Sequence, residues 1–238
     1  MLRPYNARVS SHLSGKRVLI LGAETEIGRA VTTAVAEAGA SVAAVAATSD
    51  AEAAFAVQRL ARRLSAGGRK VIAQAIDATN EAAVRVMVRQ VSKELGGLSA
   101  VVYCQQPLEQ LTREDVEGKS SDELGKLMEE RFEHYAERTH PISSHILEFG
   151  GPELDRAGGG PLVMVDGIAA MVAAENEPLP KWWLEQVSHE GRPIDEVVRR
   201  VIRAVRSRGL WWKAAKRMPR PLLPIYRLLA RIFRPGCS

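Results

Sequence analysis

The residues with the clearest chemical meaning lie in a turn between a short apolar run and a helical segment. The run covers residues 17–21 and ends at Gly22, and helical character begins at Ile27. Glycines in such a turn let a phosphate approach the backbone closely, and the unpaired N–H groups at the helix start attract its negative charge. This turn is therefore a candidate pyrophosphate site, formed by Gly22, Thr25, Ile27 and Gly28.

A carboxylate also stands in this turn, at Glu26. At ~4–5 Å from a phosphate charge and an effective dielectric near 20, each like-charge pair would cost about 3–4 kcal/mol before solvent relaxes. An outward-pointing side chain would avoid most of this cost and would be stabilised by the helix dipole. Glu26 is thus either a block to an anionic cofactor or a harmless residue at the helix start.

Other residues that could do chemistry have weaker patterns. Three histidines lie within twelve residues: His134, His140 and His145. Their spacings do not share a helix face, and Pro141 is expected to break the helix between them, so we predict no metal site. Cys104 follows an apolar run without a matched histidine base, which predicts a buried, inert thiol. Asp166 is a candidate carboxylate base.

The elements that must position these residues alternate between strands and helices. Strands are predicted at residues 17–21, 41–47, 70–76, 99–103 and 162–165, and helices at 27–38, 50–66, 80–95, 124–149 and 196–207. Such alternation implies right-handed crossovers and a parallel sheet that is covered on both faces. The predicted fold class is α/β, a Rossmann-like doubly wound sheet in three α/β/α layers.

The stretch from residue 13 to residue 170 resembles the short-chain dehydrogenase/reductase family. The turn matches the family's Gly-x-x-x-Gly-x-Gly spacing except at Glu26, which replaces the middle glycine. Four further segments follow in the family's order: Gly39–Val42, Asp77–Thr79, Ala100–Cys104 and Gly158–Ala170. The resemblance implies a Rossmann-like fold, NAD(P) as the cofactor, and a position near its adenine for Asp77 and Ala78.

The catalytic residues of that family are missing from this sequence. The family uses a tyrosine as general acid/base, a lysine four residues later that lowers the pKa of this tyrosine, a serine and an asparagine. The residues four positions after the tyrosines are Val9, Pro107, Thr139 and Ala230. Gly167 stands at the serine position and Arg131 near the asparagine position. Residues 103–106 replace the family's Asn-Asn-Ala-Gly turn, and Ala46–Ala47 replaces the residue that would contact the ribose.

After Ala170 the sequence departs from the family pattern. Residues 175–193 are polar and contain prolines, so the helix and strand that usually follow are expected to be absent. The sheet is thus predicted to be truncated after its fifth strand. Trp182 and Trp183 are expected to fill the space of the missing helix or, alternatively, to anchor a partner protein.

Residues 208–238 are a predicted cationic amphipathic tail that follows an SDR-like Rossmann domain of residues 1–207. Within 225–234, apolar residues recur at helical spacing with arginines opposite. A helix this short needs a surface to fold on. The residues expected to dock are Trp211, Trp212, Lys213, Lys216, Arg217, Ile225, Arg227, Leu228, Leu229, Arg231, Ile232 and Arg234.

Charge is distributed unevenly along the chain. Residues 1–198 carry a net charge of −7 and residues 199–238 carry +12. An anionic membrane face and an acidic protein partner both fit the tail, whereas its apolar half argues against nucleic acid. The N-terminus lacks a signal peptide pattern, and two cysteines cannot form a disulfide framework. We therefore expect a cytoplasmic protein, peripheral on a membrane if the tail binds lipid.

The missing proton-transfer residues favour a catalytically inactive protein that acts as a scaffold or accessory subunit of a membrane-associated or multi-protein complex. Two alternatives stay open. One is an NAD(P)-dependent oxidoreductase with an atypical active site, and the other is a dinucleotide-sensing module. The identity of the cofactor and the oligomeric state stay undetermined at this level.

Overall fold

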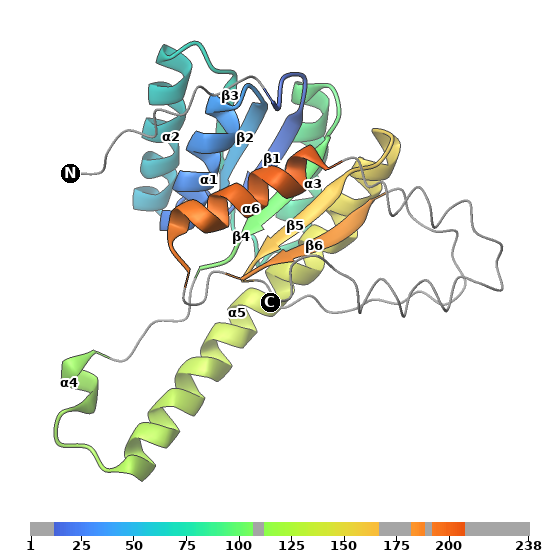
Figure 1. The fold of residues 1–238 in the computed structure, drawn as a ribbon. Helices are drawn as coiled ribbons and strands as arrows, with labels where there is room; N and C mark the ends of the chain where they lie inside the picture. The colour runs from blue at the N-terminus through green and yellow to red at the C-terminus, as the bar shows by residue number, and fades with distance from the viewer. Residues whose placement is uncertain (1–11, 107–111, 167–181, 189–191, 208–238) are drawn as a thin grey trace, which may run out of the picture.

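A six-stranded parallel sheet forms the centre of the protein, with the strand order β3-β2-β1-β4-β5-β6 (Figure 1). The computed structural model describes residues 12–106, 112–166, 182–188 and 192–207. The strands are β1 (Arg17–Leu21), β2 (Ser41–Ala46), β3 (Val71–Ala75), β4 (Ala100–Cys104), β5 (Pro161–Val165) and β6 (Trp183–Val187). The order runs outwards in both directions from β1, which confirms the predicted doubly wound fold.

Helices cover both faces of the sheet and bury two separate cores. One layer contains α1 (Glu26–Glu37), α2 (Ala51–Ala66) and α6 (Ile194–Arg206), and the other contains α3 (Glu81–Leu95) and α5 (Ser121–Arg156). The strands are apolar at consecutive positions because side chains alternate between these cores. In β1, Val18 and Ile20 enter the first core, whereas Leu19 and Leu21 enter the second.

Side-chain caps explain where three of the helices begin. Thr25, Asp50 and Asn80 each precede a helix and accept a hydrogen bond from a backbone N–H in its first turn. Such caps satisfy one of the donors that a helix start leaves unpaired. Thr25, which caps α1, also belongs to the candidate phosphate turn. The loop after β1 therefore ends at the residue where α1 begins.

A sixth strand corrects the prediction that the sheet is truncated after the fifth strand. β6 pairs in parallel with β5 along its whole length, from Trp183 opposite Pro161 to Val187 opposite Val165. Its sequence includes Glu185 and Gln186, and this polar content hid the strand in the sequence. An edge strand tolerates polar residues because part of it faces solvent. Trp182 packs against the core on the α5 side, and Trp183 is the first residue of β6.

The helix α5 is longer than predicted and corrects two further expectations. It runs through Pro141 and Pro152, so Pro141 does not break it and the segment before β5 is helical up to Arg156. A proline inside a helix removes one hydrogen bond. Here Ile142 and Ile146 are buried against the sheet, and this packing offsets the loss.

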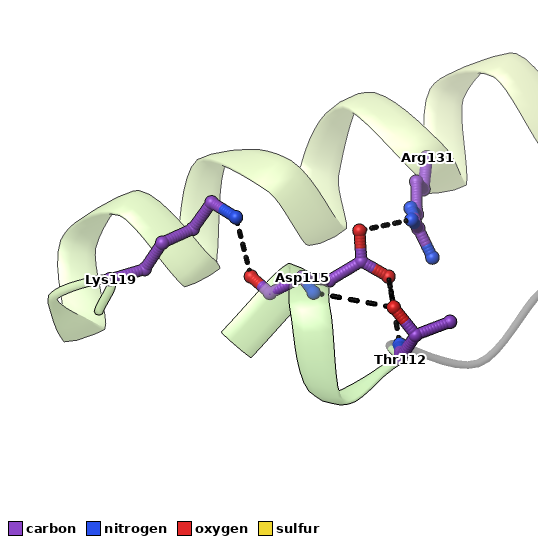
Figure 2. A network of polar contacts seen from close by, with 4 residues as sticks. All are labelled: Thr112, Asp115, Lys119 and Arg131. Atoms are coloured by element: carbon purple, nitrogen blue, oxygen red, sulfur yellow. Dashed lines mark hydrogen bonds and ion pairs between the residues drawn. The ribbon is translucent and has the colours of Figure 1, made fainter. Parts of the chain in front are cut away.

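The first half of α5 projects away from the sheet, together with the short helix α4 (Arg113–Val116) (Figure 1). We call residues 112–138 the arm. Its tip is held by polar contacts (Figure 2): the Asp115 carboxylate accepts hydrogen bonds from Thr112, and it pairs with the Arg131 guanidinium at 2.9 Å. The Lys119 ammonium donates to the Asp115 carbonyl at 2.7 Å. The arm is therefore a structured projection.

No helix in the described part of the chain has the length and apolar composition needed to cross a bilayer. The predicted tail at residues 208–238 and all of its docking residues lie outside the described residues, as does the apolar stretch after β5 that contains Gly167.

Candidate functional site

Two glycines in the turn after β1 are required by close backbone packing. Gly22 has φ +82°, and a Cβ there would lie 2.0 Å from the Cys104 carbonyl oxygen. A Cβ at Gly28 would lie 1.9 Å from the Gly22 carbonyl oxygen. Thr25 locks the turn, because its hydroxyl donates to the Gly22 carbonyl and accepts from the Gly28 N–H, both at 2.9 Å.

The turn leaves backbone donors at the start of α1. In the described structure, the N–H groups of Glu26 and Ile27 have no hydrogen-bond partner, whereas the side chain of Ile27 is buried in the core. Glu26 itself is exposed, which fits the outward-pointing interpretation of its carboxylate. Asp166 is the one non-glycine residue with positive φ in the described residues, so position 26 does not require a glycine conformation. These features fit a diphosphate group.

The carboxylate that faces the interior of this site is Glu24, a residue that sequence reasoning missed. Its two oxygens accept the backbone N–H of Ala47, at 3.1 and 3.2 Å. Burial raises the pKa of Glu24, and its hydrogen bonds and the nearby Arg138 and Arg29 oppose this rise. The end of β2 has no acidic side chain, and Glu24 of the turn after β1 lies there instead. The absence of an acidic residue at the end of β2 was the signal in the sequence that could have indicated a carboxylate from another segment.

A cavity of about 380 Å³ opens at the carboxyl edge of the sheet beside Glu24. Its wall combines the turn, the ends of β2 and β4, and one side of α5. The lining residues are Glu24, Ala47, Tyr103, Cys104, Gln106, Leu127, Glu130, Arg131, His134, Tyr135, Arg138, Thr139 and Ile142. In open α/β sheets, ligands bind at this edge where the strand order reverses.

Comparison with known proteins agrees with the turn and the topology. The family model described as short chain dehydrogenase matches residues 16–117. Over this part of the sequence the chain is similar to the short-chain dehydrogenases. It is 39% identical over 92 residues to glycine betaine reductase of Emericella nidulans, covering 39% of this chain and 7% of that protein. It is 36% identical over 95 residues to a short chain dehydrogenase of Pseudocercospora fijiensis, covering 40% and 29% respectively.

Solved dehydrogenases share the fold over a larger part of the chain. A short-chain type dehydrogenase/reductase from Mycobacterium marinum matches with TM-score 0.51 and 28% identity, covering 64% of this chain and 56% of that one. A hydroxysteroid dehydrogenase from Escherichia coli matches with TM-score 0.52 and 21% identity, covering 68% and 62%. The chain therefore spans less than two thirds of the length of each of these relatives.

The positions that correspond to the family's catalytic residues hold other side chains in this chain. Arg131, near the asparagine position, lines the cavity and is paired with Asp115 of the arm. Gln105 belongs to the segment that replaces the family's Asn-Asn-Ala-Gly turn. It is 1% exposed, and its amide donates to the Tyr135 hydroxyl. The Gln105 amide oxygen is buried and has no hydrogen-bond partner in the described structure.

Two tyrosines stand at this edge, Tyr103 and Tyr135, and both line the cavity. Burial raises the pKa of Tyr103 and, to a smaller extent, that of Tyr135. Asp166 adds to the rise at Tyr135, so this candidate base lies near that phenol. Cys104 is buried and burial raises the pKa of its thiol, as expected for an inert cysteine. The basic side chains among the described lining residues are two arginines and a histidine, with no lysine.

The predicted adenine contacts lie after β3 and outside the cavity wall. The Asp77 carboxylate accepts hydrogen bonds from the backbone and hydroxyl of Thr79, at 3.0 and 2.6 Å. Ala78 is buried, its N–H donates to the Ala47 carbonyl at 3.1 Å, and its own carbonyl lies 3.2 Å from His145 Nδ1. The structure thus joins Ala78 to the end of β2, next to Glu24. No group of three metal-ligating side chains occurs in the described part of the chain.

Proposed function

We propose that this chain is a catalytically inactive relative of the short-chain dehydrogenases and acts as a scaffold or accessory subunit of a protein complex. The observation that carries the proposal is that no tyrosine in the sequence is followed by a lysine four residues later. In the described structure no lysine lines the cavity wall either, and burial raises the pKa of the two tyrosines there.

The chemical reason is that hydride transfer to or from a carbonyl needs a group that moves a proton. A general acid or base works best when its pKa lies near the operating pH. Burial moves the pKa of Tyr103 and Tyr135 away from neutrality. The amine that the family places beside its tyrosine would act in the opposite direction. Neither phenol is therefore suited to the family's reaction.

A binding role is supported by two elements that the nucleotide fold does not need. The arm extends beyond the sheet and exposes apolar side chains, with Phe132 53% exposed and Met128 40% exposed. The sequence of residues 208–238 contains eight basic residues and no acidic one. An anionic membrane surface or an acidic protein fits such a segment, whereas nucleic acid gains nothing from its apolar half.

The proposal is tested by an NADH and NADPH oxidation assay over a panel of aldehydes and ketones. We expect no turnover above the rate without protein. A family dehydrogenase assayed in parallel shows that the panel can detect the reaction. Turnover that requires the folded chain would refute the inactive-subunit proposal.

A second candidate function is dinucleotide binding, with or without turnover, and the intact turn favours it. The residues that would hold NAD(P) are Gly22, Thr25 and Gly28, with the free N–H groups of Glu26 and Ile27 toward the diphosphate. The bound nicotinamide would supply the hydride chemistry. The Glu24 carboxylate at the cavity repels an additional phosphate, which favours NAD over NADP. Thermal shift separates the proposals: no stabilisation by either nucleotide supports the scaffold, and stabilisation by NAD(H) supports the second function.

A further inference from the structure

The buried face of α5 continues into the arm, where part of it is exposed in the described structure. Four residues on this face pack into the body: Thr139, Ile142, Ile146 and Gly150. At 100° per residue they lie within an arc of about 80° on the helix. The same arc within the arm contains Leu124, Met128, Phe132 and Tyr135. We call these four residues the arm stripe.

Two residues of the arm stripe are strongly exposed, although the same face of α5 is buried in the core further along the helix. Phe132 is 53% exposed and Met128 is 40% exposed, and they lie four residues apart. At Met128 and Phe132 the helix therefore presents an apolar surface that the described residues do not bury. A second helix that packs against such a face is a common way to bury it.

Acidic side chains border the arm stripe on one side. Asp122, Glu129 and Glu133 lie about 60–100° beyond its edge on the helix. Glu129 and Glu133 are exposed and have no hydrogen bond or ion pair within the described structure. The arm as a whole contains nine acidic and five basic residues, a net charge of −4. Arg131 and Arg138 lie about 20–40° beyond the other edge of the stripe, and Arg131 is paired with Asp115. An occupant that is apolar on one face and positively charged therefore fits the acidic border of the stripe.

We propose that residues 225–234 of the same molecule cover the arm stripe. This segment has apolar residues at helical spacing and three arginines: Arg227, Arg231 and Arg234. Arginine side chains can lie along an apolar surface and still reach a carboxylate at its border. A second copy of the arm fits less well, because two surfaces of net charge −4 repel each other. The proposal does not depend on whether the chain is catalytic.

The length of the connecting chain allows this contact. Residues 208–224 separate the segment from the end of α6, and a connection of this length spans up to ~60 Å. α6 follows β6 and returns along the sheet, so it ends at the edge opposite to the arm. The distance from the end of α6 to the middle of the arm is about one strand length plus half of the projecting helix, which together amount to about 30 Å. The tether can therefore reach the arm and keeps the local concentration of the segment high.

A nitroxide label on Cys237 of the full-length chain tests this proposal. Cys237 lies three residues beyond Arg234, and Cys104 is buried with a raised thiol pKa, so it reacts slowly. Paramagnetic broadening of backbone amide signals then reports which residues the tail approaches. We expect broadening at residues 124–135 and little at residues 81–95 of α3, and dilution should not change it.

Matched variants distinguish a specific contact from general attraction. Phe132→Ala and Glu129→Lys/Glu133→Lys should each reduce the broadening of the arm at least about threefold. The controls are Phe55→Ala, at a phenylalanine that is 61% exposed on α2, and Glu37→Lys/Glu94→Lys on α1 and α3; both should leave it unchanged. The proposal would be overturned if the arm and α3 were broadened equally, or if Phe132→Ala left the broadening of the arm unchanged. Loss of the broadening on dilution would also overturn it, because this result would indicate contact with a second copy.

Discussion

The variant Gly28→Ala probes the packing of the phosphate turn against α1. A new Cβ at this position lies 1.9 Å from the Gly22 carbonyl oxygen and 2.9 Å from the Ala23 Cα. Both neighbours are backbone atoms, so relief of the clash requires the turn and the helix to move apart. In a well-packed interior, such overpacking costs about 1–3 kcal/mol and sometimes more. Alanine would recover up to ~1 kcal/mol through its better helix propensity.

The net expectation for Gly28→Ala is a loss of about 2 kcal/mol in the free energy of unfolding. Urea denaturation measures this loss as a lower midpoint at unchanged slope. In a domain of this size the melting temperature should fall by roughly 4–8 °C. The turn is also the candidate diphosphate site, so any nucleotide-induced stabilisation should disappear in the same variant.

The matched control is Gly125→Ala in the first half of α5. Gly125 is also helical, but a Cβ there meets no atom within 4 Å. Only the helix propensity acts, and the variant should be neutral or more stable by up to ~1 kcal/mol. A free energy of unfolding for Gly28→Ala within about 0.5 kcal/mol of that of the unmodified chain would lie in the range of ordinary surface substitutions. Such a result would show that the close approach of the turn to α1 is wrong.

Three further predictions concern Glu24, Cys104 and the arm. The pKa of Glu24 is raised by burial in the folded state, so the folded chain binds more protons than the unfolded chain as the pH rises through and above 4.5, and stability falls over that window. Glu24→Gln should remove this loss and appear more stabilising at pH 7 than at pH 4 in urea denaturation; an equal effect at both values would contradict it. Cys104 is buried and its thiol pKa is raised, so a maleimide should label it at least about a hundredfold more slowly in the native chain than in denaturant; comparable rates, read by mass spectrometry of the peptide, would show an open site. Asp115→Ala removes the Asp115 side-chain half of the capping box of α4 and the pair with Arg131, which should accelerate amide hydrogen exchange at residues 112–117 without moving the global urea midpoint, because these contacts lie on the surface. The control Asp50→Ala removes the cap of α2 instead and should leave the arm's exchange unchanged.

Local patterns predicted most of the elements of this fold. The strands β1 to β5 are apolar runs bounded by glycines or polar turns, and their buried positions alternate between the two cores. Three helix starts carry their caps in the sequence, at Thr25, Asp50 and Asn80. These signals are local because they depend on backbone hydrogen bonds and side-chain periodicity within one segment.

The candidate site was predicted only in part. The turn residues Gly22, Thr25 and Gly28 lie together as their spacing indicates. Glu24 was not identified, because its importance comes from the Ala47 N–H at the end of another strand. The elevated pKa of Tyr135 likewise depends on burial and on Asp166 of a distant loop. Contacts between segments far apart in the chain have no signature within either segment.

The sequence by itself determined the class of the fold, the phosphate turn and the absence of a tyrosine followed by lysine at the family's spacing. The tertiary structure alone decided that β6 exists, that α5 continues through Pro141, and that its apolar face extends into the arm. The physical reason is the same in each case. A polar edge strand and a proline-containing helix are weak when judged locally, and they are stabilised by hydrogen bonds to β5 and by burial against the sheet, which come from residues elsewhere in the chain.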